Sequence, residues 1–553
     1  MKKTRRIAAF IAAMAMAATL AVPSVMMSAS AAGTGVITIT DASGATHNTL
    51  SAFQIFTADV DANHDLIVTG WGDGVNITDL SAAIVADTDL STAIGALTND
   101  AAGAKAAATA ISNLTPANAE KLAKLIAKNT AGNGKAAEAT SGSTTIVGLD
   151  NGYYIVVDTA AATKDSYTAY TLGMLAVVNG QTTNATTKLD FPSFDKQIGD
   201  INDTTDAAGT YTFNEAADHD IGDDVPFKLI ATIPSNIEKY DTYKMIFHDN
   251  LQDGVFNFNN DIVVRYYSSD SDTTGTVVTS AFTKATTNNE NNKFTNAHGD
   301  KTEDFTLTCN DIKAIAGITV TPTGHFEVTY TATLTEDAVI GEDGNWNGAY
   351  LEYSNNPNAS GSGDTGNTGD SPEDTVVAFT YQAVVNKVDG DNQPLSGATF
   401  TLVKNLEDDT TKNYGVVTAN SGATFVFNGL DDGTYVLTET VPPAGGYVGI
   451  DPITFTITGG EIQTDGSEAM GTPSVNSTFT AASVYNISGD AGSEVATEGT
   501  KTGAFDTTVI NRKGTELPST GGMGTILFYT VGGIMVIGAG VVLVTKKRSK
   551  NEQ

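Results

Sequence analysis

The stretch Gly433-Thr434-Tyr435-Val436-Leu437-Thr438-Glu439 reads as a β-strand. Alternate residues of a β-strand lie on one face of its sheet, so Tyr435, Leu437 and Glu439 share a face. Apart from the carboxyl group of Glu439, that face is suited to a core. Because a carboxylate is costly to bury, the strand predicts a β-sandwich core and a chemical role for its one acid.

Two further strands of the same segment carry a polar residue on an apolar face. In Ala383-Val384-Val385-Asn386-Lys387, Lys387 shares its face with apolar residues at alternate positions. Asn511 stands in the same way at the end of Thr507-Thr508-Val509-Ile510-Asn511. Burial favours the neutral forms of lysine and of a carboxylic acid, and a neutral amine is a nucleophile. If the three meet, the Lys387 amine attacks the Asn511 side-chain carbonyl, Glu439 relays protons and ammonia leaves.

The segment Tyr435-Val436-Leu437-Thr438-Glu439-Thr440-Val441-Pro442-Pro443-Ala444-Gly445-Gly446-Tyr447 resembles the E-box of Gram-positive pilins. The parent domain of that motif is the collagen-adhesin B-type immunoglobulin-like domain. The Tyr, Leu, Glu-Thr, Pro and closing Gly-Tyr of the pattern are present, with one extra residue near the Pro-Gly segment. In that family the Glu catalyses a Lys–Asn isopeptide bond. The resemblance therefore implies a Lys387–Asn511 cross-link with Glu439 as its catalyst.

A second trio is expected in the strand-rich segment before it. Lys196 alternates with apolar neighbours, and Tyr353-Ser354-Asn355 resembles the closing strand of the pilin middle domain. Asn355 shares the face of Tyr353, whereas Asn356 lies on the opposite face. The expected cross-link is therefore Lys196–Asn355.

The acid of this second trio has three candidates. In the resembled family an Asp is often the catalyst of the middle domain. Asp249 shares a face with Tyr243, Met245 and Phe247, so it is the expected acid. Asp241 and Glu352 remain as alternatives.

The C-terminal end begins with Leu517-Pro518-Ser519-Thr520-Gly521. An uncharged apolar run of 21 residues, Thr525 to Thr545, is long enough for one membrane-spanning helix. The basic tail Lys546-Lys547-Arg548-Ser549-Lys550 would stay in the cytoplasm. This order resembles the cell-wall sorting signal of Gram-positive surface proteins, in which a sortase cuts between Thr and Gly and passes the Thr carbonyl to an amine. The alternative is an ordinary single-span anchor.

A polymerised pilin also needs an acceptor amine, which in the family is a lysine just before the middle domain. That lysine often stands in an aromatic-Pro-Lys setting. In Thr187-Lys188-Leu189-Asp190-Phe191-Pro192 the lysine precedes the aromatic-Pro pair instead. Lys188 is the expected polymerisation lysine, and the alternative is a solvated linker lysine.

The N-terminus and the composition indicate an exported protein. Residues 1–31 combine a basic start, an apolar stretch and the small-residue cleavage site Ala29-Ser30-Ala31, which predicts a secretory signal peptide. The formal charge of −34 disfavours nucleic acid and anionic lipid as partners. With Cys309 as the one cysteine, an internal disulfide is excluded, and we expect that thiol in a core.

The chain of 553 residues has room for three or four domains. The predicted fold class is all-β: tandem immunoglobulin-like β-sandwiches, with helical insertions in the first domain and one C-terminal transmembrane helix. One such helix begins at Thr115-Pro116, an N-cap followed by proline at the first position, and ends near Asn129. The expected divisions are a signal peptide (1–31), an N-terminal domain (32–190), a middle domain (191–359), a linker (360–375), a C-terminal domain (376–515) and the sorting region (517–553).

The resemblance implies a structural backbone subunit of a sortase-assembled pilus. Its implied partners are a class C pilus sortase, the housekeeping sortase, identical and minor pilins, peptidoglycan and a host surface ligand. The alternative is a monomeric wall-anchored adhesin or an ancillary pilin with the same stalk domains. A surface enzyme is disfavoured because the sequence carries no Ser-His-Asp or Cys-His pattern. No cofactor is expected, and the six histidines form no metal-spaced cluster.

Overall fold

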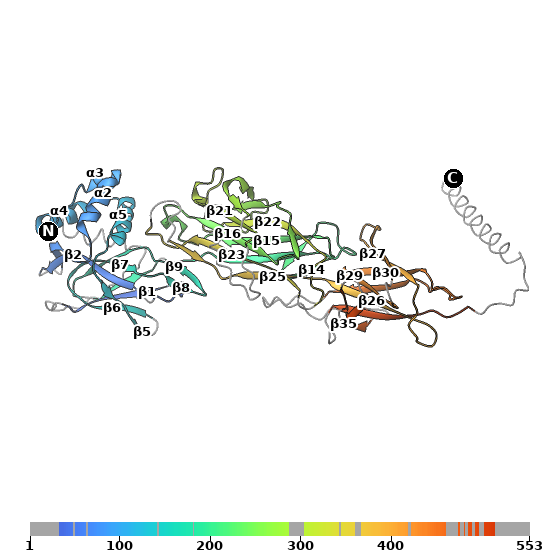
Figure 1. The fold of residues 1–553 in the computed structure, drawn as a ribbon. Helices are drawn as coiled ribbons and strands as arrows, with labels where there is room; N and C mark the ends of the chain where they lie inside the picture. The colour runs from blue at the N-terminus through green and yellow to red at the C-terminus, as the bar shows by residue number, and fades with distance from the viewer. Residues whose placement is uncertain are drawn as a thin grey trace, which may run out of the picture.

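Three β-rich domains follow one another in a row in the computed structural model (Figure 1). It describes residues 33–514 except 42, 48–49, 62–64, 141–142, 181, 188, 287–302, 342–343, 360–366, 419–421, 460–473, 476–479, 482–484, 489–492 and 497–502. Lys188, the signal peptide, the sorting motif and the apolar run after it lie outside these residues. Within the described part of the chain, no helix is long and apolar enough to cross a membrane.

The first domain pairs two sheets with a layer of helices. The sheets have the strand orders β11-β1-β6-β5 and β10-β7-β2-β3, and β4 pairs with β2. The strands are β1 (Gly35–Thr40), β2 (Leu50–Val60), β3 (Leu66–Trp71), β4 (Lys135–Ala136), β5 (Glu138–Thr140), β6 (Ser143–Leu149), β7 (Gly152–Asp158), β8 (Ala162–Lys164), β9 (Tyr167–Ala169), β10 (Met174–Val178) and β11 (Thr182–Thr186). The helices are α2 (Ile77–Ala86), α3 (Thr88–Ala93), α4 (Ala101–Ile111) and α5 (Pro116–Lys128).

Helix α5 confirms the expected helix and its cap. The Thr115 side chain accepts a hydrogen bond from the backbone N–H of Asn118, and Pro116 occupies the first helical position. Leu122 and Ile126 of α5 are buried with residues of β2 and β7, so the helical insertion shares a core with that sheet. The first domain is therefore β with helical insertions, as the sequence predicted.

The middle domain is a sandwich of two seven-stranded sheets. Their main orders are β13-β12-β15-β22-β18-β19 and β14-β25-β23-β16-β21-β20. The strands are β12 (Phe194–Asp200), β13 (Thr212–Asn214), β14 (Ala216–Asp218), β15 (Asp224–Thr232), β16 (Met245–Leu251), β17 (Phe256–Phe258), β18 (Val263–Tyr267), β19 (Thr276–Val277), β20 (Thr283–Ala285), β21 (Phe305–Cys309), β22 (His325–Leu334), β23 (Asn345–Ser354), β24 (Thr368–Asp370) and β25 (Asp374–Phe379). Short 3-10 helices span Ile237–Lys239, Thr279–Ala281 and Ile312–Ala314. Cys309 is a buried free thiol in this core, as expected.

Part of the segment expected to be a linker belongs to this sandwich. Strand β24 pairs with β23, and β25 pairs with both β23 and β14. Val376 and Ala378 of β25 are fully buried, because the alternating apolar residues of this strand face the core. The third domain therefore starts with β26, and the last strand of the middle domain leads almost directly into it.

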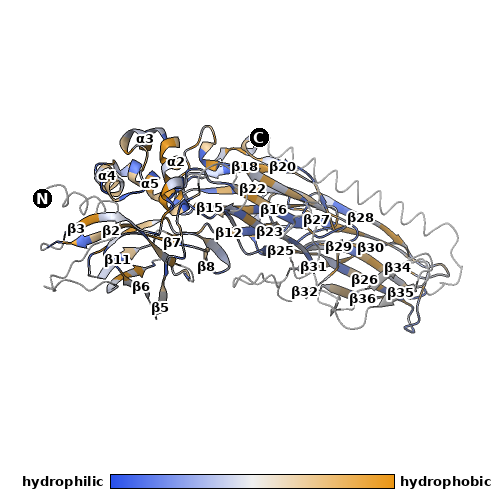
Figure 2. Ribbon diagram, turned by 60° about the vertical axis from the view of Figure 1, so that its left-hand side comes forward, coloured by the Kyte–Doolittle hydropathy of each residue, from blue (hydrophilic) through white to orange (hydrophobic). Residues whose placement is uncertain are grey.

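The third domain is a smaller sandwich with the sheet orders β29-β26-β36-β33 and β28-β27-β30-β31-β32. The strands are β26 (Tyr381–Val388), β27 (Thr399–Asn405), β28 (Thr411–Thr418), β29 (Thr424–Leu430), β30 (Gly433–Val441), β31 (Ile453–Thr458), β32 (Ser474–Val475), β33 (Thr480–Ala481), β34 (Tyr485–Ser488), β35 (Ser493–Ala496) and β36 (Ala504–Ile510). Figure 2 shows hydrophobic and hydrophilic residues alternating along the strands of these sandwiches. The fold class is therefore the predicted array of β-rich domains.

Candidate cross-link sites

In the third domain, the first strand pairs with the last strand of the same sheet. Strands β26 and β36 run parallel, with Lys387 opposite Val509. The backbone N–H of Asn511 donates to the carbonyl of Val388 at 3.0 Å, so the chain beyond β36 stays beside the end of β26. This pairing places both residues of the expected cross-link at one end of the same sheet.

Glu439 reaches this pair from β30 in the opposite sheet. The Asn511 Nδ2 donates to both carboxylate oxygens of Glu439, at 2.9 and 3.0 Å. Lys387 and Asn511 are fully buried, and Glu439 is nearly so. Asn511 Oδ1 is buried and has no hydrogen-bond partner among the described residues. The structure therefore brings the three predicted residues together.

Among the described residues, the Lys387 amine donates to two backbone carbonyl groups, which are neutral. Its Nζ lies 3.0 Å from the carbonyl oxygen of Val509 and 3.3 Å from that of Val388. Burial lowers the pKa of Lys387, and the attraction of Glu439 offsets this only in part. A lysine with a lowered pKa has more of the neutral amine that can attack a carbonyl.

The middle domain contains a buried lysine of the same kind. The Lys196 Nζ donates to Asp249 Oδ2 at 2.6 Å and to the Tyr330 hydroxyl at 3.0 Å. The Tyr330 hydroxyl donates to the same Asp249 oxygen at 2.6 Å, and Asn347 Nδ2 donates to the Tyr330 oxygen at 2.7 Å. These residues come from β12, β16, β22 and β23, so both sheets contribute to one buried site.

Burial shifts both members of the Lys196–Asp249 pair toward their neutral forms. It lowers the pKa of Lys196, and the nearby carboxylate offsets this only in part. It raises the pKa of Asp249, although Lys196 and Tyr330 both favour the carboxylate. Neither side chain is exposed to solvent. A neutral amine beside a protonated carboxyl is the pairing that amide formation requires.

The expected partner Asn355 lies elsewhere. Its Nδ2 donates to Thr168 Oγ1 of the first domain at 3.2 Å, and its backbone carbonyl accepts from the N–H of Tyr170 at 2.8 Å. Asn347 stands eight positions earlier along the same extended segment, which is roughly 26 Å at strand geometry. Since Asn347 touches the Tyr330 hydroxyl that Lys196 touches, Asn355 is out of reach of Lys196. The structure therefore places Asn347, and not the expected Asn355, beside the Tyr330 hydroxyl that Lys196 contacts.

The alternative acids are also placed away from Lys196. Asp241 pairs with Lys124 of α5 at 2.6 Å, and thus links the first domain to the middle domain. Glu352 lies 3.5 Å from the ring of His248. Of the three candidates, the structure brings Asp249 to the lysine.

A third buried lysine has a different environment. Lys404 of β27 lies 2.9 Å from Asp431, 3.3 Å from Asp203 and 3.5 Å from Asp220. Burial disfavours its charge, but these carboxylates outweigh burial and raise the pKa of Lys404 above its usual value. Lys404 is therefore a fixed cation, in contrast to Lys196 and Lys387.

The segment that carries Lys188 is attached to the first domain on both sides of it. The N–H of Thr187 donates to the carbonyl of Thr40 at 3.0 Å, and the Thr187 hydroxyl donates to Asp41. Leu189 is buried. Lys188 itself lies outside the described residues, so its role remains a prediction.

Comparisons with known proteins agree with this architecture. The SpaA family of prealbumin-like fold domains matches residues 382–469, a stretch that contains Lys387 and Glu439. The LPXTG cell wall anchor motif matches residues 511–551. The chain therefore carries a sortase sorting signal and is a cell-wall-anchored surface protein.

One curated relative is the trypsin-resistant surface T6 protein of Streptococcus pyogenes serotype M6. The two sequences are 30% identical over 264 residues, which cover 40% of this chain and 48% of the relative. The chain thus matches about half the length of this relative. The two proteins are homologous over that stretch.

A solved pilin structure shares the fold. The T6 backbone pilin of serotype M6 Streptococcus pyogenes, described as a modular three-domain structure, aligns with a TM-score of 0.52 and 18% identity, over 88% of this chain and 100% of that chain. The full-length major pilin SpaD from Corynebacterium diphtheriae aligns with a TM-score of 0.45 and 15% identity, over 88% and 100% of the two chains. The first of these likenesses shows that the three-domain fold is shared.

Proposed function

We propose that this chain is the backbone subunit of a sortase-assembled pilus, in which Lys–Asn amide bonds lock the second and third domains. The observation that carries the proposal is the buried set of Lys387, Glu439 and Asn511 in a chain with an LPXTG anchor. The set ties the first strand of the third domain to the residue after its last strand. A force applied along the chain would then act on a covalent bond, because the two ends of the domain are joined.

The proposed reaction balances without any cofactor. The neutral Lys387 amine attacks Cγ of Asn511, and the Glu439 carboxyl group hydrogen-bonds the carbonyl oxygen as negative charge develops there. Glu439 then relays a proton from the attacking nitrogen to the leaving amide nitrogen. The Cγ–Nδ2 bond breaks, a Cγ–Nζ amide bond remains, and one ammonia leaves. A rotation of the Asn511 side-chain amide by half a turn would direct its unpartnered Oδ1 toward Glu439.

The same chemistry is proposed for Lys196 and Asn347, with Asp249 as the acid. The Tyr330 hydroxyl touches the amine, the acid and the amide, so it holds the reacting groups in one place. Each bond closes a loop of more than one hundred residues. For a loop of this size the chain-entropy model gives a stabilisation of the folded domain of roughly 4–5 kcal/mol. These bonds would take the place of disulfides in a secreted chain with one cysteine.

Polymerisation is proposed to use Lys188 as the acceptor. A class C pilus sortase would cut between Thr520 and Gly521 and join the Thr520 carbonyl to Lys188 of the next subunit. The housekeeping sortase would join the finished fibre to peptidoglycan, and minor pilins would join it by the same chemistry. The chain itself acts as a structural protein, with single-turnover amide formation as its only chemistry.

The alternative is a monomeric wall-anchored adhesin or an ancillary pilin with the same stalk domains. The likeness to a three-domain backbone pilin over the whole of that chain favours the backbone role. An adhesive role toward a host surface ligand would then belong to the assembled fibre.

An immunoblot of wall extracts boiled in detergent separates these readings. The natural chain should give a high-mass ladder, and Lys188→Ala should collapse it to a single band. Lys105→Ala, at an exposed lysine of α4, is the matched control and should keep the ladder. A ladder that persists in Lys188→Ala would contradict the acceptor, and a single band for the natural chain in cells that express the pilus sortase would contradict the backbone role.

A further inference from the structure

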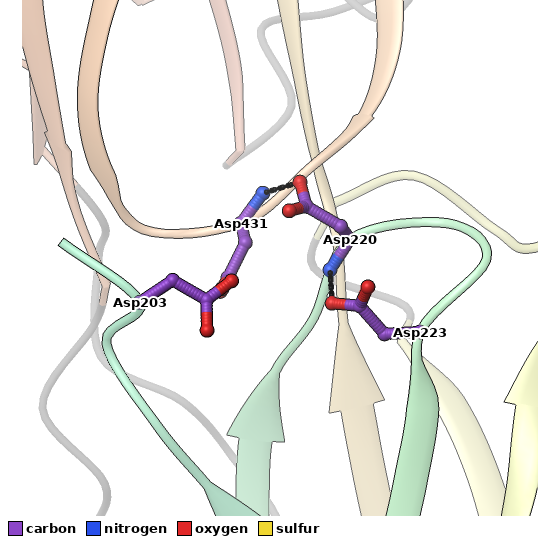
Figure 3. Close-up of side chains that lie close together, drawn as sticks. All are labelled: Asp203, Asp220, Asp223 and Asp431. Atoms are coloured by element: carbon purple, nitrogen blue, oxygen red, sulfur yellow. Dashed lines mark hydrogen bonds between the residues drawn. The ribbon is translucent and has the colours of Figure 1, made fainter. Parts of the chain in front are cut away.

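The junction between the middle and third domains gathers many carboxylates. Asp203, Asp220, Asp223 and Asp431 have carboxylate oxygens within 4.8 Å of one another. Figure 3 shows them pointing toward a common centre from loops of both domains. Asp220 and Asp431 are buried, and so much negative charge is costly to bury unless cations compensate it.

Two lysines compensate this first group. The Lys404 ammonium contacts Asp203, Asp220 and Asp431. The Lys412 ammonium lies 2.8 Å from Asp220 and 2.7 Å from Asp223. Each of the four carboxylates therefore has a lysine partner, and the centre of the group is occupied by protein cations.

A second group of carboxylates at the same junction lacks such compensation. Asp218, Asp431 and Asp432 also present oxygens within 4.8 Å of one another. Among the described residues, the lysine contact of this group is the one between Lys404 and Asp431, which the first group shares. Asp432 accepts a hydrogen bond from the neutral amide of Asn202 at 2.6 Å.

Asp218 is the residue that indicates a ligand. It is only 5% exposed, and its Oδ2 is buried with no hydrogen-bond partner in the described part of the chain. A buried carboxylate oxygen normally has at least one partner. Asp218 is one of the three residues of this second group, so a cation held among them would give its carboxyl group a further partner.

We propose that Asp218, Asp431 and Asp432 bind one Ca²⁺ ion between the middle and third domains. Oxygens within 4.8 Å of one another are close enough for one ion to bridge them after small side-chain shifts, because Ca²⁺–oxygen distances in proteins are 2.3–2.6 Å. The donors are carboxylates, which suit a hard divalent cation. Water and the carboxylate oxygens left over would complete the coordination shell.

The local backbone fixes these ligands in place. Asp431 and Asp432 form the turn between β29 and β30, and Gly433 follows with a φ of +135°. A Cβ at Gly433 would lie 2.6 Å from Lys404 Cε, so glycine lets the turn close over the lysine. Asp218 ends β14 of the middle domain. The ion would therefore bridge two domains and stiffen their junction.

Calorimetric titration of CaCl₂ into the chelator-treated mature chain tests the proposal. One Ca²⁺ should bind with a Kd of roughly 10⁻⁴–10⁻³ M, the range of extracellular modules, and should raise the Tm. Asp218→Asn should weaken binding at least tenfold. Asp223→Asn, at a carboxylate of the same junction that Lys412 holds, is the matched control and should bind within twofold of the natural chain.

Three results of these measurements would overturn the proposal. The first is the absence of both binding heat and a Tm shift. The second is an Asp218→Asn variant that binds as the natural chain does. The third is an equal loss in Asp218→Asn and Asp223→Asn, which would assign the ion to the first group.

If Asp218→Asn does not fold, terbium luminescence of the natural chain decides, because Tyr381 hydrogen-bonds Asp218 and should sensitise a bound Tb³⁺. A missing signal would also contradict the site.

Discussion

Lys196 and Lys404 are both fully buried in β-sandwich domains, yet their surroundings favour opposite charge states. Lys196 meets one carboxyl group and one hydroxyl group, and burial lowers its pKa. Lys404 meets three carboxylates, and its pKa is raised. Burial alone therefore does not make a lysine reactive. In the proposed function, the number of anions around the amine decides whether it serves as a nucleophile or as a cation.

The largest expected effect concerns the middle domain, where Asn347→Ala and Asn355→Ala should differ sharply. Asn347→Ala removes the carbonyl that Lys196 would attack, so the free energy of unfolding of that domain should fall by about 5 kcal/mol. Asn355→Ala loses the side-chain hydrogen bond to Thr168, at about 1 kcal/mol. Differential scanning calorimetry measures both. The reverse order would restore Asn355 as the partner.

Substitution of the fixed cation should cost nearly as much through a different mechanism. Lys404→Met keeps the volume of the side chain but leaves carboxylates of the junction unpaired, which should destabilise the protein by roughly 3–5 kcal/mol. Denaturant unfolding measures the change, with Lys105→Met on an exposed face as the control. Lys404 should form no amide bond, so the natural chain should yield an unlinked tryptic peptide ending at this lysine. A cross-linked Lys404 would contradict the distinction between the two kinds of lysine.

The smallest expected effect is a pH dependence of the stability of the first domain. It comes from His47, which, like Lys404, has carboxylates as partners. Burial works against the charge of His47, but the hydrogen bond to Asp158 and the Asp41 carboxylate 3.6 Å away outweigh it and raise the pKa of His47 to about 9. Because the folded-state pKa exceeds the ordinary value of 6.5, the stabilisation is fully present below pH 6.5 and is lost as the pH rises through about 9.

Thermal unfolding between pH 6 and pH 10 measures this effect. The Tm of the first domain should fall as the pH rises through this window. His47→Gln should flatten that fall, because the titrating group is gone. A His47→Gln variant with the same pH profile as the natural chain would assign the dependence to another group.

Strand periodicity predicted which residues of the candidate sites face inward, but it could not predict which asparagine lies beside Lys196. Alternation put Lys387, Glu439 and Asn511 on inward faces, and sheet pairing then brought them together. The same alternation puts Asn347 and Asn355 on one face of one extended segment, so it cannot choose between them. That choice depends on the position of β23 relative to Tyr330, which only the sandwich packing determines.

The grouping of carboxylates at the junction between the middle and third domains could not be predicted from the sequence for a similar reason. Its carboxylates come from loop and strand ends more than two hundred positions apart, such as Asp218 and Asp431. No spacing rule connects them. The start of the third domain was misplaced because the glycine-rich segment around residue 365 resembles a linker, although β24 and β25 directly after it complete the middle sheet.

Intact mass spectrometry of the mature chain, followed by peptide mapping, tests the central claim most directly. The mass should be lower than the sequence mass by two ammonia molecules, with linked peptides that pair Lys387 with Asn511 and Lys196 with Asn347. In Glu439→Gln one of the two losses should disappear, because the acid that relays the proton is gone. A natural chain with its full sequence mass, and no linked peptides, would contradict the account.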